Sequence, residues 1–293
     1  MPLPTCRLEE LVAEAASLAR LDGSAATLLR NGSNAMFQLP GDVVARVAPA
    51  GRTATAEREV QIARWLSSQG VRVTQPLGDV PQPTVVADRA ITWWHTIPPH
   101  RAGTPGELGS VLRVVHALEP PDFSLPRYDP FDGIEMRLIQ QTVLDPSDTD
   151  WLINHYRRLR EEYEHLAPFQ SPRLIHGDAW QGNLAVVDGE APILLDFEKV
   201  AVADPAWDLV QIAVDHTDFG RVSAEEYADF VHSYGGRDIV QWPGYQCLAA
   251  VQVLRWAAFA LGKADDARAL PEIRHRVACI QGRVPKPWSW TAF

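Results

Sequence analysis

The stretch that decides the fold runs from Leu174 to Asp208 and reads LIHGDAWQGNLAVVDGEAPILLDFEKVAVADPAWD. Two short apolar runs, Leu184 to Val187 and Ile193 to Leu195, flank the turn Asp188-Gly189-Glu190. Apolar runs separated by a turn that contains Gly are typical of a β-hairpin. We therefore expect a hairpin in the middle of this stretch, with polar residues at the open ends of its strands.

Polar side chains stand on both sides of this expected hairpin. Asp178 and Asn183 precede its first strand, and Asp196 follows its second. Folding the hairpin would bring these side chains together. Mg²⁺ binds oxygen ligands from one or two protein groups and takes the rest from phosphates and water, so the spacing favours Asn183 and Asp196 as metal ligands. Asp178 would accept the proton of an attacking hydroxyl. As an alternative, Asp178 and Asn183 would only cap or turn the chain.

The order of these residues forms a composite motif. It consists of His176-Gly177-Asp178, four residues, Asn183, the hairpin, and then Asp196-Phe197-Glu198. The motif resembles that of the aminoglycoside phosphotransferase and choline kinase family, which shares the two-lobed protein-kinase-like fold. Asp204-Pro205-Ala206-Trp207-Asp208 matches a further motif of the same family.

The resemblance implies roles for residues around the catalytic loop. Asp208 would brace that loop rather than touch substrate, and His176 would belong to the same supporting set. Glu198 stands where protein kinases carry Gly, which points to small substrates rather than proteins.

Length and resemblance together predict an α+β fold with two lobes. At 293 residues the chain exceeds the usual size of a single core. We expect a small antiparallel-sheet lobe over residues 1–97 that binds nucleotide. A mainly helical lobe over residues 98–293 would carry the catalytic and acceptor-binding groups.

Composition narrows the classes of partner. The formal net charge of -10 disfavours nucleic acid, since phosphate backbones are bound by clustered Lys and Arg. An acidic surface suits a cationic ligand better. No apolar run is long enough to span a bilayer, and the first residues lack a basic region followed by an apolar one. We therefore expect no membrane partner and a cytoplasmic location.

The N-terminal part carries a candidate phosphate site. Ser33 and Asn34 lie in a polar loop between two expected strands, and Arg46 lies on the next strand, Val43 to Val47. Small residues let main-chain N–H groups approach nucleotide phosphates, and a cation on the following strand meets the same phosphates. The family usually has Lys there, whereas Arg presents a planar fork. An ordinary polar turn is the alternative for this loop.

A helix is expected from Thr53 to Gln69, and two acidic residues, Glu57 and Glu59, lie early in it. The resemblance implies that one of them pairs with Arg46, and Glu59 fits the family pattern better. Alternatively, both acids only favour the positive end of the helix dipole.

A stiff connector follows the second N-terminal hairpin and reads HTIPP from His95 to Pro99. In the family such a connector receives the adenine through main-chain groups. His95 and Ile97 are the candidate contacts.

The acceptor site is expected in the helical lobe. Asp129, Asp132 and Glu135 cluster in the Pro- and Asp-rich segment 121–149, and with Glu198 they would form a negative pocket that favours amino-containing acceptors. Alternatively, these acids are solvated surface groups. On the later helix from Tyr245 to Leu261, Trp256 and Phe259 are expected in the core.

These observations predict an ATP- and Mg²⁺-dependent phosphotransferase that moves the γ-phosphate to a hydroxyl of a small molecule. GTP is the alternative donor. Aminocyclitol antibiotics, with a role in antibiotic resistance, and metabolic sugars or amino alcohols are the alternative acceptors. A nucleotide-binding protein without turnover is a further alternative, although such a protein needs no base at Asp178.

Overall fold

The computed structural model describes residues 4–291, and contacts divide the chain into two compact units. The first unit comprises Met1–Gly103 and Gly182–Val200, and the second comprises Thr104–Gln181 and Ala201–Phe293. The hairpin of the quoted stretch thus belongs to the first unit, although segments of the second unit flank it in sequence. The division expected from the sequence, 1–97 and 98–293, stays a prediction.

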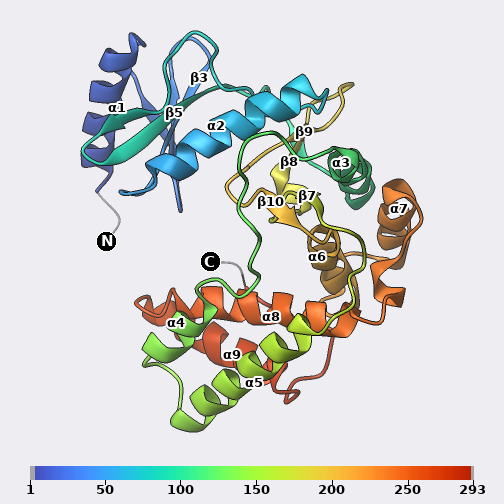
Figure 1. Ribbon diagram of the computed structural model, residues 1–293. Helices are drawn as coiled ribbons and strands as arrows, with labels where there is room; N and C mark the ends of the chain where they lie inside the picture. Colours follow the sequence, from blue (N-terminus) through green and yellow to red (C-terminus); the bar gives the residue numbers. More distant parts are fainter. Residues whose placement is uncertain (1–3, 292–293) are drawn as a thin grey trace. The chain divides into compact units, whose positions relative to one another are not determined.

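In the described part of the chain, five strands of the first unit form an antiparallel sheet in the order β1-β2-β3-β5-β4 (Figure 1). The strand expected from Val43 to Val47 has those bounds in the structure, because apolar positions and flanking turn residues mark it in the sequence. The elements are α1 (Thr5–Ala19), β1 (Thr27–Asn31), β2 (Ala35–Leu39), β3 (Val43–Val47), α2 (Thr53–Ser68), β4 (Thr84–Val86) and β5 (Arg89–His95).

The two faces of this sheet meet different helices. Successive residues of a strand point to opposite faces. Phe37, Ala45 and Trp93 are register neighbours on β2, β3 and β5, and they share a buried apolar core with α1. Arg46, the next residue on β3, pairs with Glu59 of α2. The sheet therefore presents an apolar side to α1 and a charged position to α2.

A smaller sheet of the first unit contains the hairpin of the quoted stretch. Its strands are β6 (Arg101–Ala102), β8 (Leu184–Val186) and β9 (Ile193–Leu194). The antiparallel pairing of β8 with β9 confirms the predicted hairpin. Pairing of β6 with β8 was not expected, because a contact over such a sequence separation leaves no local pattern.

The second unit is mainly helical, and α8 (Tyr245–Leu261) lies at its centre (Figure 1). Helices α4, α5, α6 and α9 contact α8, which is apolar on most sides, as expected of a buried helix. The further elements of this unit are α3 (Pro105–Ala117), α4 (Ile134–Gln140), α5 (Pro146–Glu164), β7 (Arg173–Ile175), β10 (Ala201–Ala203), α6 (Ala206–Thr217), α7 (Ala224–Tyr234), η2 (Ile239–Gln241), η3 (Ala267–Ala269) and α9 (Leu270–Ile280). The short helix η1 (Gln181–Asn183) contains the point in the sequence at which the two units divide.

One expectation for α8 was wrong. Trp256 is half-buried, as its packing against Phe219 requires, but the side chain of Phe259 is 48% exposed. Lys263 lies over the Phe259 ring at 5.4 Å, so a cation covers part of that aromatic face. The helical spacing in the sequence placed the bulky residues on a helix, but it did not indicate which side of α8 lacks a neighbouring helix.

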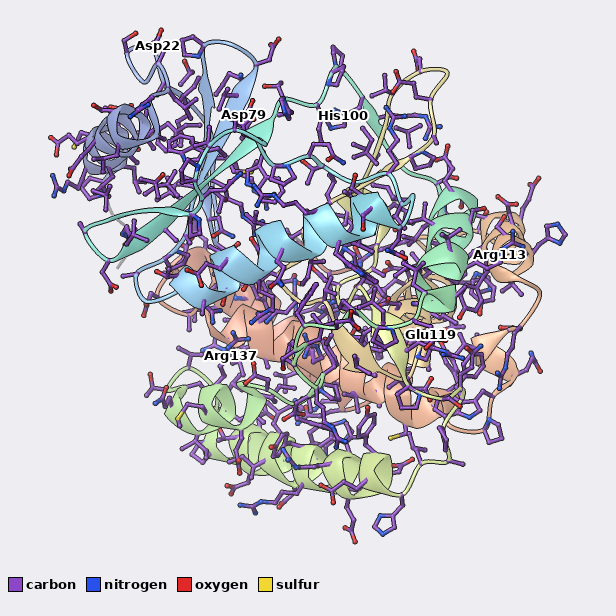
Figure 2. All side chains as sticks on the ribbon, turned by 45° about the horizontal axis from the view of Figure 1, so that its top comes forward. Asp22, Asp79, His100, Arg113, Glu119 and Arg137 are labelled. Carbon is purple, nitrogen blue, oxygen red and sulfur yellow. The ribbon has the colours of Figure 1, made fainter. Side chains whose placement is uncertain are left out.

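Many charged side chains lie at the surface of each unit. Exposed examples are Asp22, Asp79 and His100 in the first unit, and Arg113, Glu119 and Arg137 in the second (Figure 2). A charged side chain that is buried loses its contact with water, which costs free energy unless a partner in the protein replaces that contact.

Among the described residues, no helix combines the length and the apolar character that a membrane span requires.

Candidate active site

The small hairpin of the first unit brings Asn183 next to Asp196. Leu184 pairs with Leu194, and the main-chain N–H of Leu195 donates to the carbonyl oxygen of Asn183 at 2.9 Å. Asn183 therefore lies opposite the residue that precedes Asp196. Its side chain is buried, whereas that of Asp196 is 43% exposed. The main chain of the hairpin therefore pairs as expected, and the role of Asn183 and Asp196 as metal ligands stays a prediction.

The main chain at Asp196 has a left-handed conformation, with φ 61°. Residues other than Gly rarely adopt it, although Asp and Asn do so more readily than most. The turn redirects the chain directly after β9. Glu198, two residues later, reaches Arg52 at 3.3 Å and Arg46 at 3.8 Å.

Arg46 is the centre of a charge network in the first unit. Its Nη1 lies 3.0 Å from Glu59, and its Nη2 lies 3.4 Å from Asp196. With its amide oxygen turned toward Arg46, Asn34 accepts hydrogen bonds from Nη2 at 2.8 Å and from Nε at 3.2 Å. The Arg46–Glu59 pair expected from the resemblance is therefore present. Carboxylate oxygens of Glu59, Asp196 and Glu198 lie within 4.8 Å of one another around it.

Burial changes the pKa of Glu59 more than its ion pair with Arg46 does. Desolvation raises the pKa of Glu59 to about 7, because the positive charge of Arg46 offsets only part of it and Asp196 and Glu198 oppose ionisation. The short Arg46–Glu59 distance would by itself suggest a low pKa. Burial outweighs it because one guanidinium is shared among several carboxylates.

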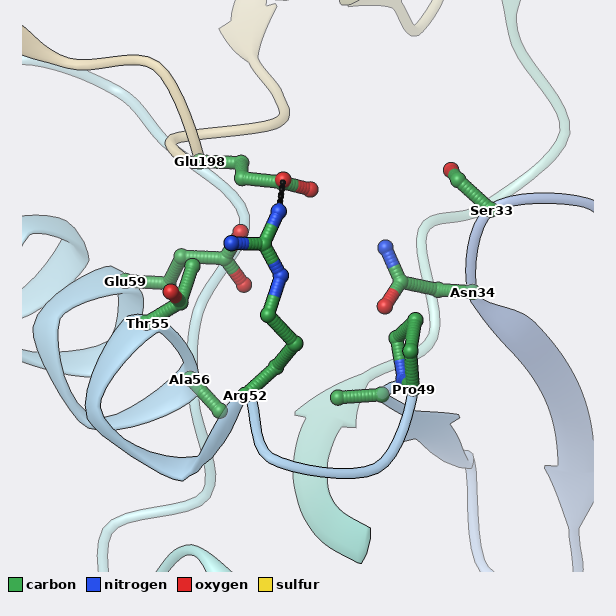
Figure 3. A pocket seen from close by; sticks show the side chains of 9 residues that line it. Ser33, Asn34, Pro49, Arg52, Thr55, Ala56, Glu59 and Glu198 are labelled. Carbon is green, nitrogen blue, oxygen red and sulfur yellow. Dashed lines mark hydrogen bonds and ion pairs between the residues drawn. The ribbon is translucent and has the colours of Figure 1, made fainter. Parts of the chain in front are cut away.

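A pocket of the first unit opens beside this network (Figure 3). Ser33 and Asn34 of the loop between β1 and β2 lie on one side, and Arg52 and Glu198 lie on the other. Thr55 and Glu59 of α2 line it as well. The structure thus groups Ser33, Asn34 and Glu59 at one pocket, and their predicted role in nucleotide binding stays a prediction. It adds Arg52, which the sequence reasoning missed because an Arg just before a helix has no distinctive pattern.

The main-chain groups of the connector after β5 differ in whether they already form hydrogen bonds within the protein. The N–H of His95 donates to Gln75 at 2.9 Å, and that of Thr96 donates to Asp42 at 2.9 Å. In the described part of the chain, no hydrogen bond to the main chain of Ile97 is found. Of the two predicted contacts, Ile97 is therefore the better placed to bond a ligand through its main chain.

In the second unit, a buried carboxylate holds the loop that follows β7. Asp208 of α6 is 0% exposed and accepts hydrogen bonds from the N–H groups of His176 at 2.6 Å and Gly177 at 2.8 Å. Its Oδ2 also lies 3.0 Å from Nε2 of His116. Asp208 therefore braces the main chain at His176 and Gly177, and the catalytic role of this loop stays a prediction.

Asp178 follows this braced main chain and is exposed. Gly177 has φ 80°, a conformation that favours glycine. Its carbonyl oxygen accepts hydrogen bonds from the hydroxyl of Tyr128 at 3.1 Å and from Nε1 of Trp207 at 3.2 Å. The N–H of Asp178 donates to Nδ1 of His176 at 3.3 Å. Burial raises the pKa of Tyr128, so its hydroxyl keeps the proton that it donates.

Sequence reasoning missed two further supports of this loop. His116 is buried, and Tyr234 lies 2.9 Å from its Nδ1, so His116 links Asp208 to α7. Asp204, the first acid of the DPAWD motif, accepts hydrogen bonds from the N–H groups of Phe169 at 2.6 Å and Ala206 at 3.0 Å. The motif could have suggested Asp204, but no local signal singles out His116.

The acidic segment of the second unit lies among arginines. Asp129, Asp132 and Glu135 are exposed, and Asp129 accepts a hydrogen bond from the N–H of Phe131 at 2.9 Å within its own turn. Glu135 lines a surface groove with Arg157 and Arg160. The structure therefore brings positive as well as negative groups to this region, and Glu198 belongs to the first unit.

Each unit, taken by itself, carries groups of the kind that phosphate transfer uses. The first unit supplies oxygen donors at Asn183 and Asp196, which are of the kind that Mg²⁺ prefers, and cations near a pocket. The second supplies an exposed carboxylate on a braced loop.

A model of the phosphotransferase enzyme family (APH) matches residues 22–251. The chain belongs to this family, whose small-molecule kinases transfer phosphate to hydroxyl acceptors. It is therefore an enzyme, a small-molecule kinase. A search among curated proteins found no match.

Solved structures show the same fold at low sequence identity. A choline/ethanolamine kinase family protein from Mesorhizobium loti is 18% identical, with 97% of this chain and 95% of that chain covered and a TM-score of 0.67. Amicoumacin kinase, in complex with AMP-PNP, Ca²⁺ and Ami, is 13% identical, with 96% of each chain covered and a TM-score of 0.71. The phosphotransferase APH(2")-IIia, in complex with GDP and kanamycin, is 16% identical, with 94% and 99% covered and a TM-score of 0.68. The predicted α+β, kinase-like fold is confirmed.

Proposed function

We propose that this kinase transfers the γ-phosphate of ATP, with Mg²⁺, to a hydroxyl group of a small molecule, and that Asp178 is the general base. The observation that carries this proposal is the brace of Asp208 on the N–H groups of His176 and Gly177. It gives the loop of Asp178 a fixed main chain, as a positioned base requires. His176 and Asp208 support the loop and do not touch substrate.

The nucleotide would be held by the first unit. Ser33 and Asn34 would approach its phosphates, and Ile97, with His95 beside it, would meet the base through main-chain groups. Arg46 and Glu59 form the ion pair that orders this region.

Asn183 and Asp196 would hold Mg²⁺, since both offer oxygen donors and lie next to each other at the end of the hairpin. A bound Mg²⁺ neutralises charge on the phosphates during transfer. Asp196 carries the charge that attracts the ion, and Asn183 contributes an amide oxygen.

Two classes of small molecule are candidates for the phosphate acceptor. Asp129, Asp132, Glu135 and Glu198 would favour an amino-containing acceptor such as an aminocyclitol antibiotic, with a role in antibiotic resistance. Arg157 and Arg160 beside Glu135 weaken that preference, because they offset its negative charge. A neutral metabolic sugar or an amino alcohol is therefore the second candidate.

A nucleotide-consumption screen tests the proposal. ATP and GTP are each offered with Mg²⁺ and a panel of aminoglycosides, sugars and amino alcohols, and acceptor-dependent loss of nucleotide is measured. We expect one class of hydroxyl acceptor to stimulate consumption of ATP more than of GTP. If the protein bound nucleotide but consumed none with any acceptor, the alternative of a non-catalytic nucleotide-binding protein would replace the proposal. A cytoplasmic location stays a prediction.

A further inference from the structure

We propose that Arg52 is the side chain that binds the phosphates of the nucleotide, and that Arg46 instead holds the surrounding carboxylates and Asn34 in place. The inference rests on the proposed function, because it needs a nucleoside triphosphate at the pocket of the first unit. It differs from the expectation from the sequence, in which Arg46 meets the phosphates.

The hydrogen-bonding capacity of Arg46 is largely used within the protein. A guanidinium has five N–H donors. Nε and Nη2 face the amide oxygen of Asn34 at 3.2 and 2.8 Å, Nη2 also faces Asp196 at 3.4 Å, and Nη1 faces Glu59 at 3.0 Å. The side chain is only 14% exposed. Turning Arg46 toward a phosphate would leave a buried carboxylate at Glu59 without its cation, which is costly.

Arg52 has the opposite character. It immediately precedes α2, its side chain is 53% exposed, and it lines the pocket that Ser33 and Asn34 also line. Its guanidinium points to the carboxylate of Glu198 (Figure 3), and in the described part of the chain this is its one hydrogen-bond partner, at 3.3 Å. Most of its donors are therefore available to a ligand at little energetic cost.

The carboxylates around Arg46 favour a second cation beside the pocket. Glu59, Asp196 and Glu198 carry a formal charge of -3 when all are ionised, and Arg46 brings the sum to -2. A polyphosphate would be repelled by this cluster. Arg52 brings the sum to -1 and presents a planar fork that matches phosphate oxygens. On binding, Arg52 would exchange Glu198 for a phosphate.

The alternative is that Arg52 and Glu198 form an ordinary exposed ion pair, which contributes little. Arg7 offers a matched control, since it is 52% exposed in the same unit and pairs with Glu10 at 2.6 Å away from the pocket. Arg52→Gln, Arg52→Lys and Arg7→Gln would be titrated calorimetrically with Mg²⁺-ATP, ADP and adenosine. Thermal unfolding of each variant shows whether the fold is retained.

We expect Arg52→Gln to weaken ATP binding about tenfold, the scale of one charge-assisted hydrogen bond, while adenosine affinity is unchanged. Arg52→Lys should lie between wild type and Arg52→Gln, and Arg7→Gln should match wild type. The inference is overturned if Arg52→Gln binds ATP as wild type does, or if adenosine binding weakens as much as ATP binding. If the wild-type protein itself bound neither ATP nor GTP, the proposed function would fail, and the inference with it.

Discussion

Charged side chains hold one another in the first unit, whereas in the second unit a carboxylate holds the main chain. Arg46 contacts Glu59 and Asp196 through ion pairs of 3.0 and 3.4 Å. Asp208 is fully buried and accepts hydrogen bonds from the main chain of His176 and Gly177 at 2.6 and 2.8 Å. In both arrangements carboxylates bind N–H groups, which belong to a side chain in the first unit and to the main chain in the second.

The difference shows which part of each region can respond to a ligand. Bonds to main-chain N–H groups fix the path of a loop, because the backbone cannot exchange partners without refolding locally. Ion pairs between side chains can exchange a carboxylate for another anion at modest cost. We therefore expect changes in the first unit to alter ligand and metal affinity, and changes in the second to alter turnover and stability.

The largest effect should follow from Asp178→Ala. Turnover should fall by about 10²–10⁴-fold, the usual contribution of a general base, because no other group takes the hydroxyl proton. Nucleotide affinity should stay close to that of wild type, since Asp178 acts on the acceptor. Steady-state rates and calorimetric titration check both parts, with exposed Asp122→Ala of the same unit as the control. Turnover within a few-fold of wild type would remove Asp178 from this role.

Asp208→Asn tests the brace of the second unit. The amide nitrogen of Asn cannot accept the hydrogen bonds that a carboxylate oxygen accepts, so at least one buried N–H donor loses its partner. We expect the free energy of unfolding to fall by about 3 kcal/mol, and turnover to fall with it. Chemical denaturation measures the change, and exposed Asp150→Asn on α5 is the control. Equal unfolding midpoints for the two variants would show that the brace adds no stability.

The metal site of the first unit should respond to Asp196→Asn and Asn183→Ala. Asn tolerates the φ of 61° at position 196, so this change removes charge while keeping the turn. The Mg²⁺ concentration needed for half-maximal nucleotide binding should rise about tenfold for Asp196→Asn and less for Asn183→Ala, because a charged ligand neutralises the metal and an amide does not. A Mg²⁺ titration that is unchanged in both variants would contradict the assignment of the metal ligands.

The smallest effect concerns His155 on α5. Burial lowers the pKa of His155 to about 4, with the charge of nearby Arg158 as the second cause. The unfolded state, with its ordinary pKa of 6.5, binds more protons between these two values. The contribution of neutral His155 to stability is therefore full above the unfolded pKa and is lost as pH falls toward the folded pKa.

Replacing this residue tests that dependence. The unfolding temperature of wild type should fall more steeply than that of His155→Gln when the pH is lowered from about 7 to about 4.5. The difference between the two proteins cancels the titration of groups they share. Parallel curves would show that His155 titrates alike in the folded and unfolded states.

Much of the local structure could be predicted from the sequence. The sequence predicts a helix from Ala224 to Tyr234, and α7 has these bounds; Ser223 and Glu226 form the capping box at its start. The hairpin of β8 and β9 follows from two apolar runs around a Gly turn. The pairing of Arg46 with Glu59 needed the family resemblance, since nothing local links β3 to α2.

Contacts between distant segments could not be predicted. His116 reaches Asp208 only because α3 packs beside α7 and β7, and Arg52 meets Glu198 only because the hairpin segment joins the first unit. Phe259 was expected in the core but lies 48% exposed, because its burial depends on whether another helix covers that side of α8.

By itself, the sequence determined the helices, the hairpins and the order of the motif residues, because backbone sterics, turn chemistry and apolar periodicity act over a few neighbouring positions. The tertiary structure alone decided which carboxylate holds main chain and which holds a cation. Asp208 is fully buried against the N–H groups of another segment, while Glu198 keeps 23% of its side chain exposed beside Arg52. Burial and partners depend on the packing of distant segments, and these two factors set whether a charged group becomes a fixed support or a contact that a ligand can replace.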